Sequence, residues 1–534
     1  MQQHIKLVQG RDELRDTACK LIGSLAAWLS MRHSALLQTC AGFVVHSTTS
    51  DDGNRTSADA CKTAVQIVQA WPAAVPTAPI AEVRARVTPH VPQQLHTQPV
   101  MQRGQRDGLL TSVWLQGLCV QVRRLAQRRV QPHEVIDEVS ESSCNVVNAA
   151  ARLIGDGPVA EMQRLAPLLV QPLVDTLERA GSGNVAPTQV AHVLRMLATA
   201  FQFLGSAALS HGEKRRTVLQ LAERCWPLLL QWAAGVAVQG AHVPDALCDV
   251  LTQIMSGAGH ERTQLLPHVM PCLAALFRTC GHAACLAATT SIAEQAAPSD
   301  QCSAEALAHL YSCADGMLGA VQRSTQSAQG TPPDVLAASV TLVSRLALFH
   351  PQHALQPMTL AVGVELAMHA LQQSERPTLQ AATQAFAHLL APSAAQQKRI
   401  IAQNAPAGAL QQLVQQQAPA LVRCLLVCLC RNAPQDSWTS LARVLYVLRQ
   451  THGASVGDAL RGTLCNGAFE GLQGTPLTPE DCQKVAQLLT PQALPERRFR
   501  ALVSDFAGIA HGVASSDDLL AYELPVQHGV VTIE

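Results

Sequence analysis

Hydrophobic side chains recur at intervals of three and four residues along most of this chain. The clearest example is 419–464, where an apolar run is followed by a bend rich in helix-breaking residues and then by a second set of apolar positions. These positions are Trp438, Leu441, Leu445 and Leu448. Residues three and four apart lie on one face of a helix. The stretch therefore predicts two amphipathic helices joined by a short turn, the second capped by Asp436 or Ser437 and ended by Gly453.

The same pattern repeats from residue 108 onward, and hardly any segment alternates with the period of two that is typical of strands. Further helices are expected near 108–127, 132–154, 158–180, 187–206, 214–236, 243–256, 263–279, 282–296, 303–324, 333–349, 357–373, 378–391, 454–465, 478–489 and 495–512. Two helices with their turns take about 40 residues, a period typical of HEAT-like repeats. Because one pair cannot bury its apolar face alone, it stacks on its neighbours. The pattern predicts an all-α, HEAT/armadillo-like α-solenoid, a superhelix of antiparallel helix pairs.

The repeats are interrupted twice, which divides the chain into six segments. The expected segments are HEAT-like repeats over 1–71, a flexible Pro/Gln-rich insertion over 72–107, HEAT-like repeats over 108–392, a Gln/Ala-rich connection over 393–418, C-terminal HEAT-like repeats over 419–513 and a tail over 514–534. The insertion is rich in proline and polar residues. It can neither sustain a helix nor bury a core, so we expect a loop there.

Bulk composition narrows the classes of function. The 534 residues include 39 basic and 39 acidic side chains, so the formal net charge is zero. Proteins that bind nucleic acid usually carry a basic excess or stripe, and no direct nucleic-acid partner is expected. No run approaches the roughly 18 to 20 apolar residues that a membrane helix needs, and the first residues lack the apolar core of a secretory signal. We therefore expect a soluble intracellular protein without membrane insertion.

The 17 cysteines are spread singly, and no CxxC motif occurs. In a long chain without a secretory signal they are expected to be reduced and to serve as small apolar core residues. Cys280, His282 and Cys285 lie close together in the sequence, but a closed zinc site needs four ligands and a fourth is not evident. Core cysteines with a surface histidine are the favoured interpretation, and no metal or other cofactor is expected.

One motif suggests catalysis. Gly453-Ala454-Ser455-Val456-Gly457 matches the G-x-S-x-G pattern of the hydrolase nucleophile elbow, which needs a strand before the serine and a helix after it. Helices are expected on both sides here, so Gly453 more plausibly ends one helix while Ser455 or Asp458 begins the next. An enzyme acting through Ser455 remains a third hypothesis behind two binding functions, and no enzyme is predicted.

Two basic clusters and an acidic one could meet a partner of opposite charge, although such clusters are more often solvated faces. The basic clusters are Arg123, Arg124, Arg128 and Arg129, and Lys214, Arg215 and Arg216. The acidic cluster lies in the tail and consists of Asp517, Asp518 and Glu523.

Three stretches resemble the C-terminal half of importin-β (karyopherin-β) superfamily receptors of the importin-13 and transportin-SR (transportin-3) branch. The most specific is Arg497-Arg498-Phe499-Arg500-Ala501-Leu502-Val503-Ser504-Asp505-Phe506, with Gly512, Asp517 and Tyr522 after it. The others are 419–464, similar to a late repeat, and Leu14 to Leu29, similar to a mid-protein repeat. The order of helices between them also agrees with the family, although few residues are identical.

This resemblance implies a HEAT superhelix that works as a nucleocytoplasmic transport receptor, found in cytoplasm and nucleus, including the nuclear pore and envelope. Family members bind protein cargo on the concave face, contact FG-repeat nucleoporins and exchange cargo when the small GTPase Ran binds GTP. Candidate partner-binding residues are Arg123, Arg128, Arg215, Arg497 and Arg498. Arg497 and Arg498 could instead fix the last helix onto the solenoid.

Two departures from the family affect the expected partners. The N-terminal repeats that form the main Ran-binding arch have no counterpart, so we expect either a truncated form or one that has lost or relocated control by Ran. The segment 246–255 lacks the arginines with which transportin-SR receptors read phosphorylated Arg-Ser domains. Cargo of the importin-13 kind is therefore expected. The alternative function is a HEAT-repeat scaffold without a transport role.

Overall fold

The computed structural model describes helices and turns over most of the chain from residue 118 onward. The described residues are 18, 21–22, 118–127, 136–181, 186–209, 211–235, 242–297, 303–327, 330–390, 394–403, 405–466, 469, 474–489 and 494–522. The repeats expected over 1–71 and the insertion expected over 72–107 therefore lie outside the described residues, apart from positions 18, 21 and 22. The chain divides into two compact units, Met1–Cys280 and Gly281–Glu534.

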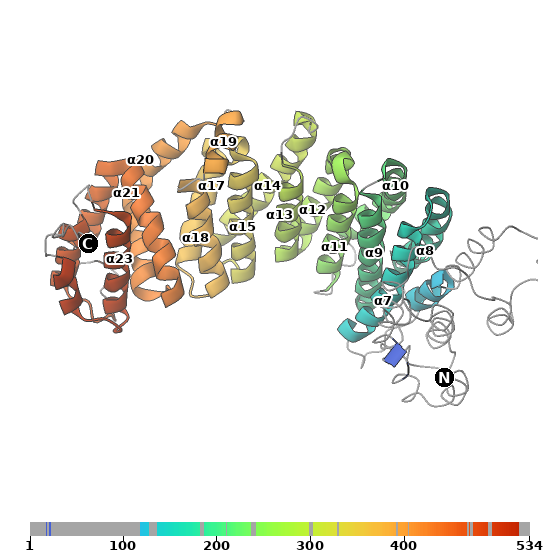
Figure 1. Ribbon diagram of the computed structural model, residues 1–534, viewed down its shortest axis with the longest axis horizontal. Helices are drawn as coiled ribbons and strands as arrows, with labels where there is room; N and C mark the ends of the chain where they lie inside the picture. The colour runs from blue at the N-terminus through green and yellow to red at the C-terminus, as the bar shows by residue number, and fades with distance from the viewer. Residues whose placement is uncertain are drawn as a thin grey trace, which may run out of the picture. The chain divides into compact units, whose positions relative to one another are not determined.

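The described helices of the first unit form two layers (Figure 1). One layer stacks α7 (Ile136–Asp156), α9 (Pro187–Ala208) and α11 (His242–Gly257) side by side. The other contains α8 (Val159–Arg179), α10 (Gly212–Ala234) and α12 (Leu266–Cys280), with the short 3-10 helix η3 (Gly259–Gln264) before α12. A further helical segment covers 118–127. Because the chain alternates between the layers, each consecutive pair is an antiparallel hairpin whose apolar faces meet between the layers.

The second unit repeats this plan. One layer stacks α13 (Ala283–Gln295), α15 (Pro333–Phe349), α18 (Arg376–Leu390), α21 (Gln435–Leu464) and α23 (Glu496–Ala510). The other contains α14 (Ala304–Thr325), α17 (Pro357–Leu371) and α20 (Ala407–Arg431), while α22 (Pro479–Leu489) packs on α21. Three short helices lie between or after them, namely α16 (Pro351–Ala354), α19 (Ala394–Ala402) and the 3-10 helix η5 (Ser516–Tyr522).

Small residues let the backbones of the first layer approach closely. A Cβ atom built on Gly205 of α9 would lie 2.6 Å from the Cα atom of Gly257 in α11, and one built on Gly155 of α7 would lie 2.6 Å from the Cβ atom of Ala207 in α9. Real Cβ atoms essentially never approach other heavy atoms so closely. Glycine is therefore required at positions 205 and 257 for α9 and α11 to stack as they do, and at position 155 for α7 to stack on α9.

Local sequence explains where several helices begin. Ser303 Oγ accepts a hydrogen bond from Ala306 N at 3.1 Å and caps α14. Thr478 and Asp481 form a reciprocal capping box before α22, with Thr478 Oγ1 accepting from Asp481 N (3.1 Å) and Asp481 Oδ2 accepting from Thr478 N (3.0 Å). Helix α15 begins at Pro333, a residue whose fixed φ suits the first helical position. The proline at this position explains why the start of α15 matches the prediction for 333–349.

The structure corrects three expectations about the C-terminal repeats. Helix α20 begins at Ala407 and runs through Pro419, where a new helix was expected; Pro419 is exposed, so solvent can satisfy the carbonyl that it leaves unpaired. Helix α21 begins at Gln435 after Pro434, and neither Asp436 nor Ser437 caps it. Asp436 instead pairs with Arg376 of α18. Lastly, the expected tail over 514–534, for which no helix was predicted, contains the 3-10 helix η5.

The backbone break expected at Gly453 is confirmed. Its φ of 41° and ψ of −105° interrupt α21, which continues to Leu464 beyond the kink. No strand occurs among the described residues, and the two-layered stacks of helix pairs confirm the all-α, HEAT-like solenoid. The first helices of successive pairs in the second unit begin at residues 283, 333, 376, 435 and 496. The period thus exceeds 40 residues because α16 and α19 lie between the two helices of their pairs and because several turns are long.

Within the described part of the chain, one helix, Gly408–Arg431, is long and apolar enough to cross a membrane by length and composition. Half of its most apolar window is buried inside the protein. The helix corresponds to α20, which packs on α17, α21 and α23. The core helix of a solenoid has the same composition, so the pattern alone is weak evidence for membrane insertion.

Candidate partner-binding surfaces

Lys214 and Arg215 begin α10 and are buried, at 7% and 6% exposure. Lys214 Nζ donates to Gly155 O (2.6 Å) in the last turn of α7. Arg215 Nη2 donates to Leu209 O (2.8 Å) just after α9, and its Nη1 donates to His260 Nδ1 (2.6 Å). Cations are favourable beside the unpaired carbonyls of helix C-termini. Both side chains therefore hold helix ends together within the unit, and Arg215 offers little surface to a partner.

The other basic cluster is only partly described. Arg123 and Arg124 are exposed on the helical segment 118–127, whereas Arg128 and Arg129 lie outside the described residues. Arg216, next to the buried pair on α10, is exposed. Partner binding by Arg123 and Arg128 stays a prediction.

The structure separates the paired arginines near the C-terminus. Arg498 Nη2 donates to the backbone carbonyl of Tyr522 (2.6 Å), and the Tyr522 hydroxyl donates to Asp505 Oδ2 (2.5 Å). Both bonds join η5 to α23, and Leu519 of η5 is fully buried. Arg498 thus holds η5 against α23, a contact within the C-terminal region. Arg497, by contrast, is exposed and makes no hydrogen bond or ion pair with any residue that the structure describes.

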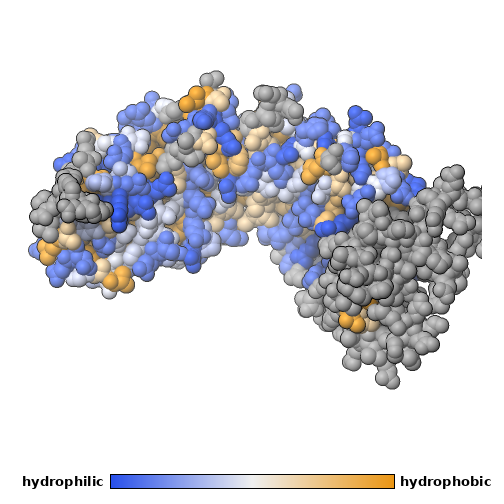
Figure 2. Space-filling view, in the orientation of Figure 1, coloured by the Kyte–Doolittle hydropathy of each residue, from blue (hydrophilic) through white to orange (hydrophobic). Residues whose placement is uncertain are grey.

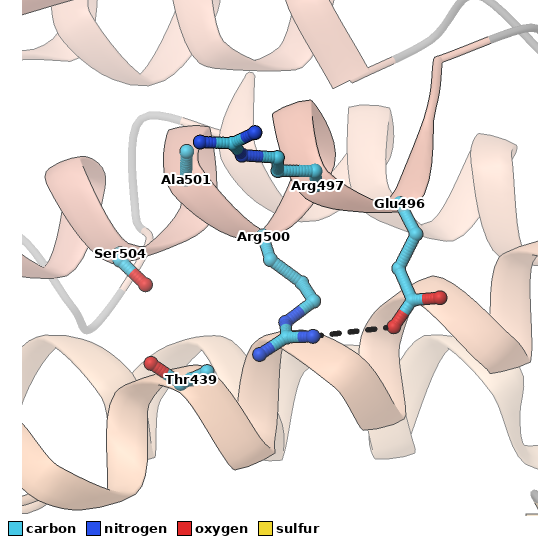
Figure 3. A pocket seen from close by; sticks show the side chains of 6 residues that line it. All are labelled: Thr439, Glu496, Arg497, Arg500, Ala501 and Ser504. Carbon is cyan, nitrogen blue, oxygen red and sulfur yellow. Dashed lines mark hydrogen bonds and ion pairs between the residues drawn. The ribbon is translucent and has the colours of Figure 1, made fainter.

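Arg497 borders an open depression between α21 and α23, shown in Figure 3. Its lining residues are Thr439, Glu496, Arg497, Arg500, Ala501 and Ser504. Arg500 points toward α21, where Thr439 lies, and its Nη1 pairs with Glu496 Oε1 one turn earlier on α23 (3.3 Å). Arg500 Nε is buried and has no hydrogen-bond partner among the residues that the structure describes. We call these six residues the arginine depression.

A second open depression lies over α7, α9 and α11 in the first unit. Its lining residues are Ser140, Glu141, Cys144, Arg195, Ala198, Thr199, Gln202, Asp249 and Gln253. Glu141 and Asp249 are exposed, and Asp245 lies one turn before Asp249 on α11. Arg195 belongs to α9, which packs between α7 and α11. We call Glu141, Asp245 and Asp249 the acidic surface.

Electrostatics and burial act together on this surface. Although Asp249 is exposed as a residue, its pKa is raised above its ordinary value, chiefly because surrounding protein atoms partly desolvate its carboxyl and then by the like charge of Asp245, while Arg195 opposes the shift. Burial also raises the pKa of the Cys144 thiol, against hydrogen bonding to Thr199 and the charge of Arg195. Three carboxylates against one guanidinium leave an acidic excess. A positively charged partner would relieve the repulsion between Asp245 and Asp249.

Neither chemical motif has the geometry of a reactive site. Ser455 lies in the part of α21 after the kink, and its hydroxyl donates to His452 O (3.0 Å), so the G-x-S-x-G pattern has helix on both sides. His282 caps α13 by accepting from Ala284 N (3.4 Å), and Cys285 is fully buried. No group of three or more metal-ligating side chains occurs among the described residues. The expectation of core cysteines with a surface histidine is confirmed for Cys285, whereas Cys280 and His282 are both half-buried.

The cysteines of the described repeats are mostly core residues, as expected. Cys272 and Cys428 are examples. Burial raises the pKa of each thiol to about 12. Such thiols are protonated at neutral pH and are poor nucleophiles. Cys465 is the exception, because it is exposed at the end of α21.

Apolar side chains on the outer surface are scattered. In Figure 2 they form small groups among hydrophilic residues on the visible face. Among the described residues, the two most exposed large ones are Met358, at the start of α17, and Ile401, near the end of α19, at 79% and 75%. Helix α19 packs on α16, directly before α17 in the chain. Single exposed apolar residues are common, so Met358 and Ile401 only mark places where an apolar ligand could contact the second unit.

Sequence reasoning missed the acidic surface and Arg500. The i, i+4 spacing of Asp245 and Asp249 places both on one helix face, which is the signal available in the sequence. Glu141 and Arg195 join them only because α7, α9 and α11 stack, and residues about 50 positions apart give no local sign of this. Arg500 stood within the recognised C-terminal motif, but its orientation toward α21 depends on tertiary packing.

Comparison with known proteins gives a family match for part of the second unit. Residues 371–456 match the family model described as importin 13 repeat. They run from the end of α17 to the kink region of α21 and include most of 419–464, one of the three stretches that carry the resemblance. The other two lie outside the match. No curated protein matches the chain.

Solved structures give a likeness in fold. A crystal structure of importin beta, grown in polyethylene glycol, aligns with 96% of this chain and 55% of its own, with 11% sequence identity and a TM-score of 0.50. A second one, grown in ammonium sulfate, aligns with 96% of this chain and 57% of its own, with 14% identity and a TM-score of 0.45. An engineered protein aligns with 90% of this chain and 96% of its own, with 15% identity and a TM-score of 0.37.

At 11% identity the first importin beta structure shows a common fold, and this chain spans about half the length of that protein. The family match carries the sequence information, over 371–456 alone. The chain thus shares the fold of stacked helix pairs with importin beta, and residues 371–456 resemble the importin 13 repeat in sequence.

Proposed function

We propose that this chain is a nucleocytoplasmic transport receptor of the importin-β superfamily, or the cargo-binding part of one. The observation that carries the proposal is the importin 13 repeat match over 371–456, located within a stack of HEAT-like helix pairs. Such stacks bind partners over extended surfaces of successive helices instead of in one deep cavity. Both depressions described above are open, in keeping with this mode of binding.

The acidic surface of the first unit is the proposed contact for a basic segment of cargo. Glu141, Asp245 and Asp249 come from helices of one layer, so a cargo segment lying across α7, α9 and α11 would meet all three. Opposite charges across an interface accelerate association and disfavour partners of the wrong sign. This assignment replaces Arg215 as a contact, because that side chain is buried between helix ends.

Two further partners follow from the proposed receptor function. FG-repeat nucleoporins present phenylalanine side chains, which need exposed apolar positions such as Met358 and Ile401. Ran is the third proposed partner, bound by these repeats or by repeats of a longer product. The protein would then occur in both cytoplasm and nucleus, including the nuclear pore and envelope.

The test recovers a product of the native gene tagged at its C-terminus and measures bound Ran with GTP-locked and GDP-bound forms, together with the product's mass. GTP-dependent recovery of Ran supports a receptor, and a mass about twice that of this chain would place the Ran-binding repeats in a longer protein. Absence of both Ran and FG-repeat nucleoporins from a product of this length would favour the HEAT scaffold without a transport role.

A matched pair of variants tests the cargo surface. Asp249→Lys reverses a charge within the acidic surface, whereas Glu178→Lys makes the same change at an exposed position of α8, in the other layer. We expect Asp249→Lys to lower recovery of cargo from extract severalfold, and Glu178→Lys to leave it unchanged. Equal recovery with both variants would remove the acidic surface from the proposal without affecting the Ran test.

A further inference from the structure

We infer that the arginine depression between α21 and α23 binds an acidic peptide segment of a partner protein, through Arg497 and Arg500. The inference concerns the second unit alone and does not depend on the transport function or on the acidic surface. It rests on three features of the depression. Its lining carries an excess of positive charge, some of its N–H donors have no acceptor among the described residues, and the Glu496 carboxylate already forms an ion pair with Arg500.

The charge and the donors fit a carboxylate ligand. The lining includes two guanidinium groups, those of Arg497 and Arg500, and one carboxylate, that of Glu496, so the positive charge is in excess. Arg497 has no ion-pair partner among the described residues, and Arg500 Nε is buried without a hydrogen-bond acceptor. Guanidinium groups bind carboxylates through paired N–H donors, and the hydroxyls of Thr439 and Ser504 can donate to carbonyl or carboxylate oxygens.

The resident carboxylate shows that one of the two arginines accepts this chemistry. Glu496 Oε1 lies 3.3 Å from Arg500 Nη1, and the two side chains are 45% and 35% exposed. An ion pair so open to solvent is weak, so an incoming carboxylate can displace it at little cost. Glu496 is therefore a competitor for the same arginine, and its removal is expected to strengthen binding.

The neighbouring residues restrict the inference to Arg497 and Arg500. Arg498 donates a hydrogen bond to the Tyr522 carbonyl and so helps to hold η5 on α23. Arg443 is exposed on α21, one turn after Thr439, but does not line the depression. Arg443 therefore supplies a control of equal charge on the same helix pair. If only the general positive potential of this region mattered, Arg443 would contribute as much as Arg497.

The experiment uses the full chain and a fluorescein-labelled peptide of alternating glutamate and glycine, with a glutamine version as the uncharged control. Fluorescence anisotropy at roughly 50 mM salt should show binding of the glutamate peptide alone, weakening at higher salt as exposed charges are screened. Arg497→Ala and Arg500→Ala should each weaken binding about tenfold, the size of one charge-assisted hydrogen bond. Arg443→Ala should leave it within about twofold.

Glu496→Gln keeps the inference testable even if an arginine variant is poorly folded. It should tighten binding of the glutamate peptide about threefold, because it removes the competitor but keeps the side-chain shape. An equal loss with Arg443→Ala, or unchanged or weaker binding with Glu496→Gln, would overturn the inference. A version of the peptide with phosphoserine in place of glutamate completes the set. If it bound more than tenfold tighter than the glutamate peptide, the depression would be a phosphate site and the assignment to carboxylates would be wrong.

Discussion

The close approach of α9 and α11 can be tested by adding a single methyl group. In Gly205→Ala the new Cβ atom would lie 2.6 Å from the Cα atom of Gly257. Carbon atoms in contact are ordinarily separated by about 3.5 to 4.0 Å, so the two helices must move apart by about 1 Å. The atom in the way belongs to the backbone of Gly257 and cannot rotate aside, unlike a flexible side chain.

The expected change is the difference between two opposing effects. Alanine is favoured over glycine inside a helix by about 1 kcal/mol, because it restricts the unfolded chain and shields the backbone. Overpacking usually costs about 1 to 3 kcal/mol, and a rigid backbone contact belongs at the upper end of that range. The net loss of unfolding free energy is therefore about 2 kcal/mol, or a fall in Tm of roughly 4 to 8 °C for a unit of this size.

Gly316→Ala is the matched control. Gly316 lies inside α14, and a Cβ atom built on it meets no other heavy atom within 4 Å. There the helix preference acts alone, and we expect a gain of about 0.5 to 1 kcal/mol. Thermal unfolding followed by circular dichroism gives the sign of each change, and hydrogen exchange localises the loss to α9 and α11. If Gly205→Ala were as stabilising as Gly316→Ala, the backbone contact between α9 and α11 would be refuted.

Two further predictions concern the contact of Lys214 with the end of α7 and the hydrogen bonds that join η5 to α23. Lys214→Met removes the donor to Gly155 O while keeping an apolar side chain of similar length. We expect the free energy of unfolding, measured by urea titration, to fall by about 1 to 3 kcal/mol. An unchanged urea midpoint would contradict the contact. Tyr522→Phe removes only the hydroxyl that donates to Asp505, so we expect about 1 kcal/mol of local destabilisation, seen as faster proteolysis and hydrogen exchange over 516–522 with an unchanged Tm for the rest of the unit.

The helices were predictable from the sequence because their signals are local. Period, proline and glycine placement located α11, α13, α15 and α22 to within about one residue, and the break at Gly453 was found by the same reasoning. Pro419 was misread because a proline inside a helix is tolerated when its side of the helix faces solvent, and exposure is a tertiary property.

The functional surfaces were much less predictable, since they depend on which face of each helix is covered. Lys214, Arg215 and Arg216 are three consecutive cations, yet two of them reach carbonyls at the ends of neighbouring helices and only Arg216 is exposed. Arg497 and Arg498 differ in the same way, because successive residues of a helix point about 100° apart. A cluster of basic residues in the sequence therefore does not show which of its side chains are exposed and available to bind a partner.

A last prediction concerns the stability of the protein at low pH. It follows from a cluster of polar side chains at the start of α16, formed by Tyr311, Asp315, His350 and His353. His350 is fully buried, its Nε2 donates to Ala293 O (2.8 Å), and its Nδ1 lies 3.1 Å from the Tyr311 hydroxyl, which can donate to it. His353 stacks on Tyr311 with ring centroids 4.1 Å apart and contacts Asp315. Both nitrogens of His350 are thus engaged in the neutral form. Burial, with a smaller opposing effect of the Ala293 carbonyl, lowers the pKa of His350 from 6.5 to about 4.

The sign of the pH dependence follows from proton uptake. Between pH 6.5 and pH 4 the unfolded chain binds a proton at His350 that the folded chain does not, so stability is complete above pH 6.5 and decreases as the pH falls through this window. A shift of this size corresponds to about 3 kcal/mol. His350→Gln keeps a donor for Ala293 O without a titratable group. It should therefore reduce the loss of stability between pH 6.5 and pH 4 by that amount, even if it is less stable than the wild type at neutral pH. Parallel curves of unfolding free energy against pH for the two proteins would show that folding does not lower the pKa of His350, and that its buried contacts do not resist protonation.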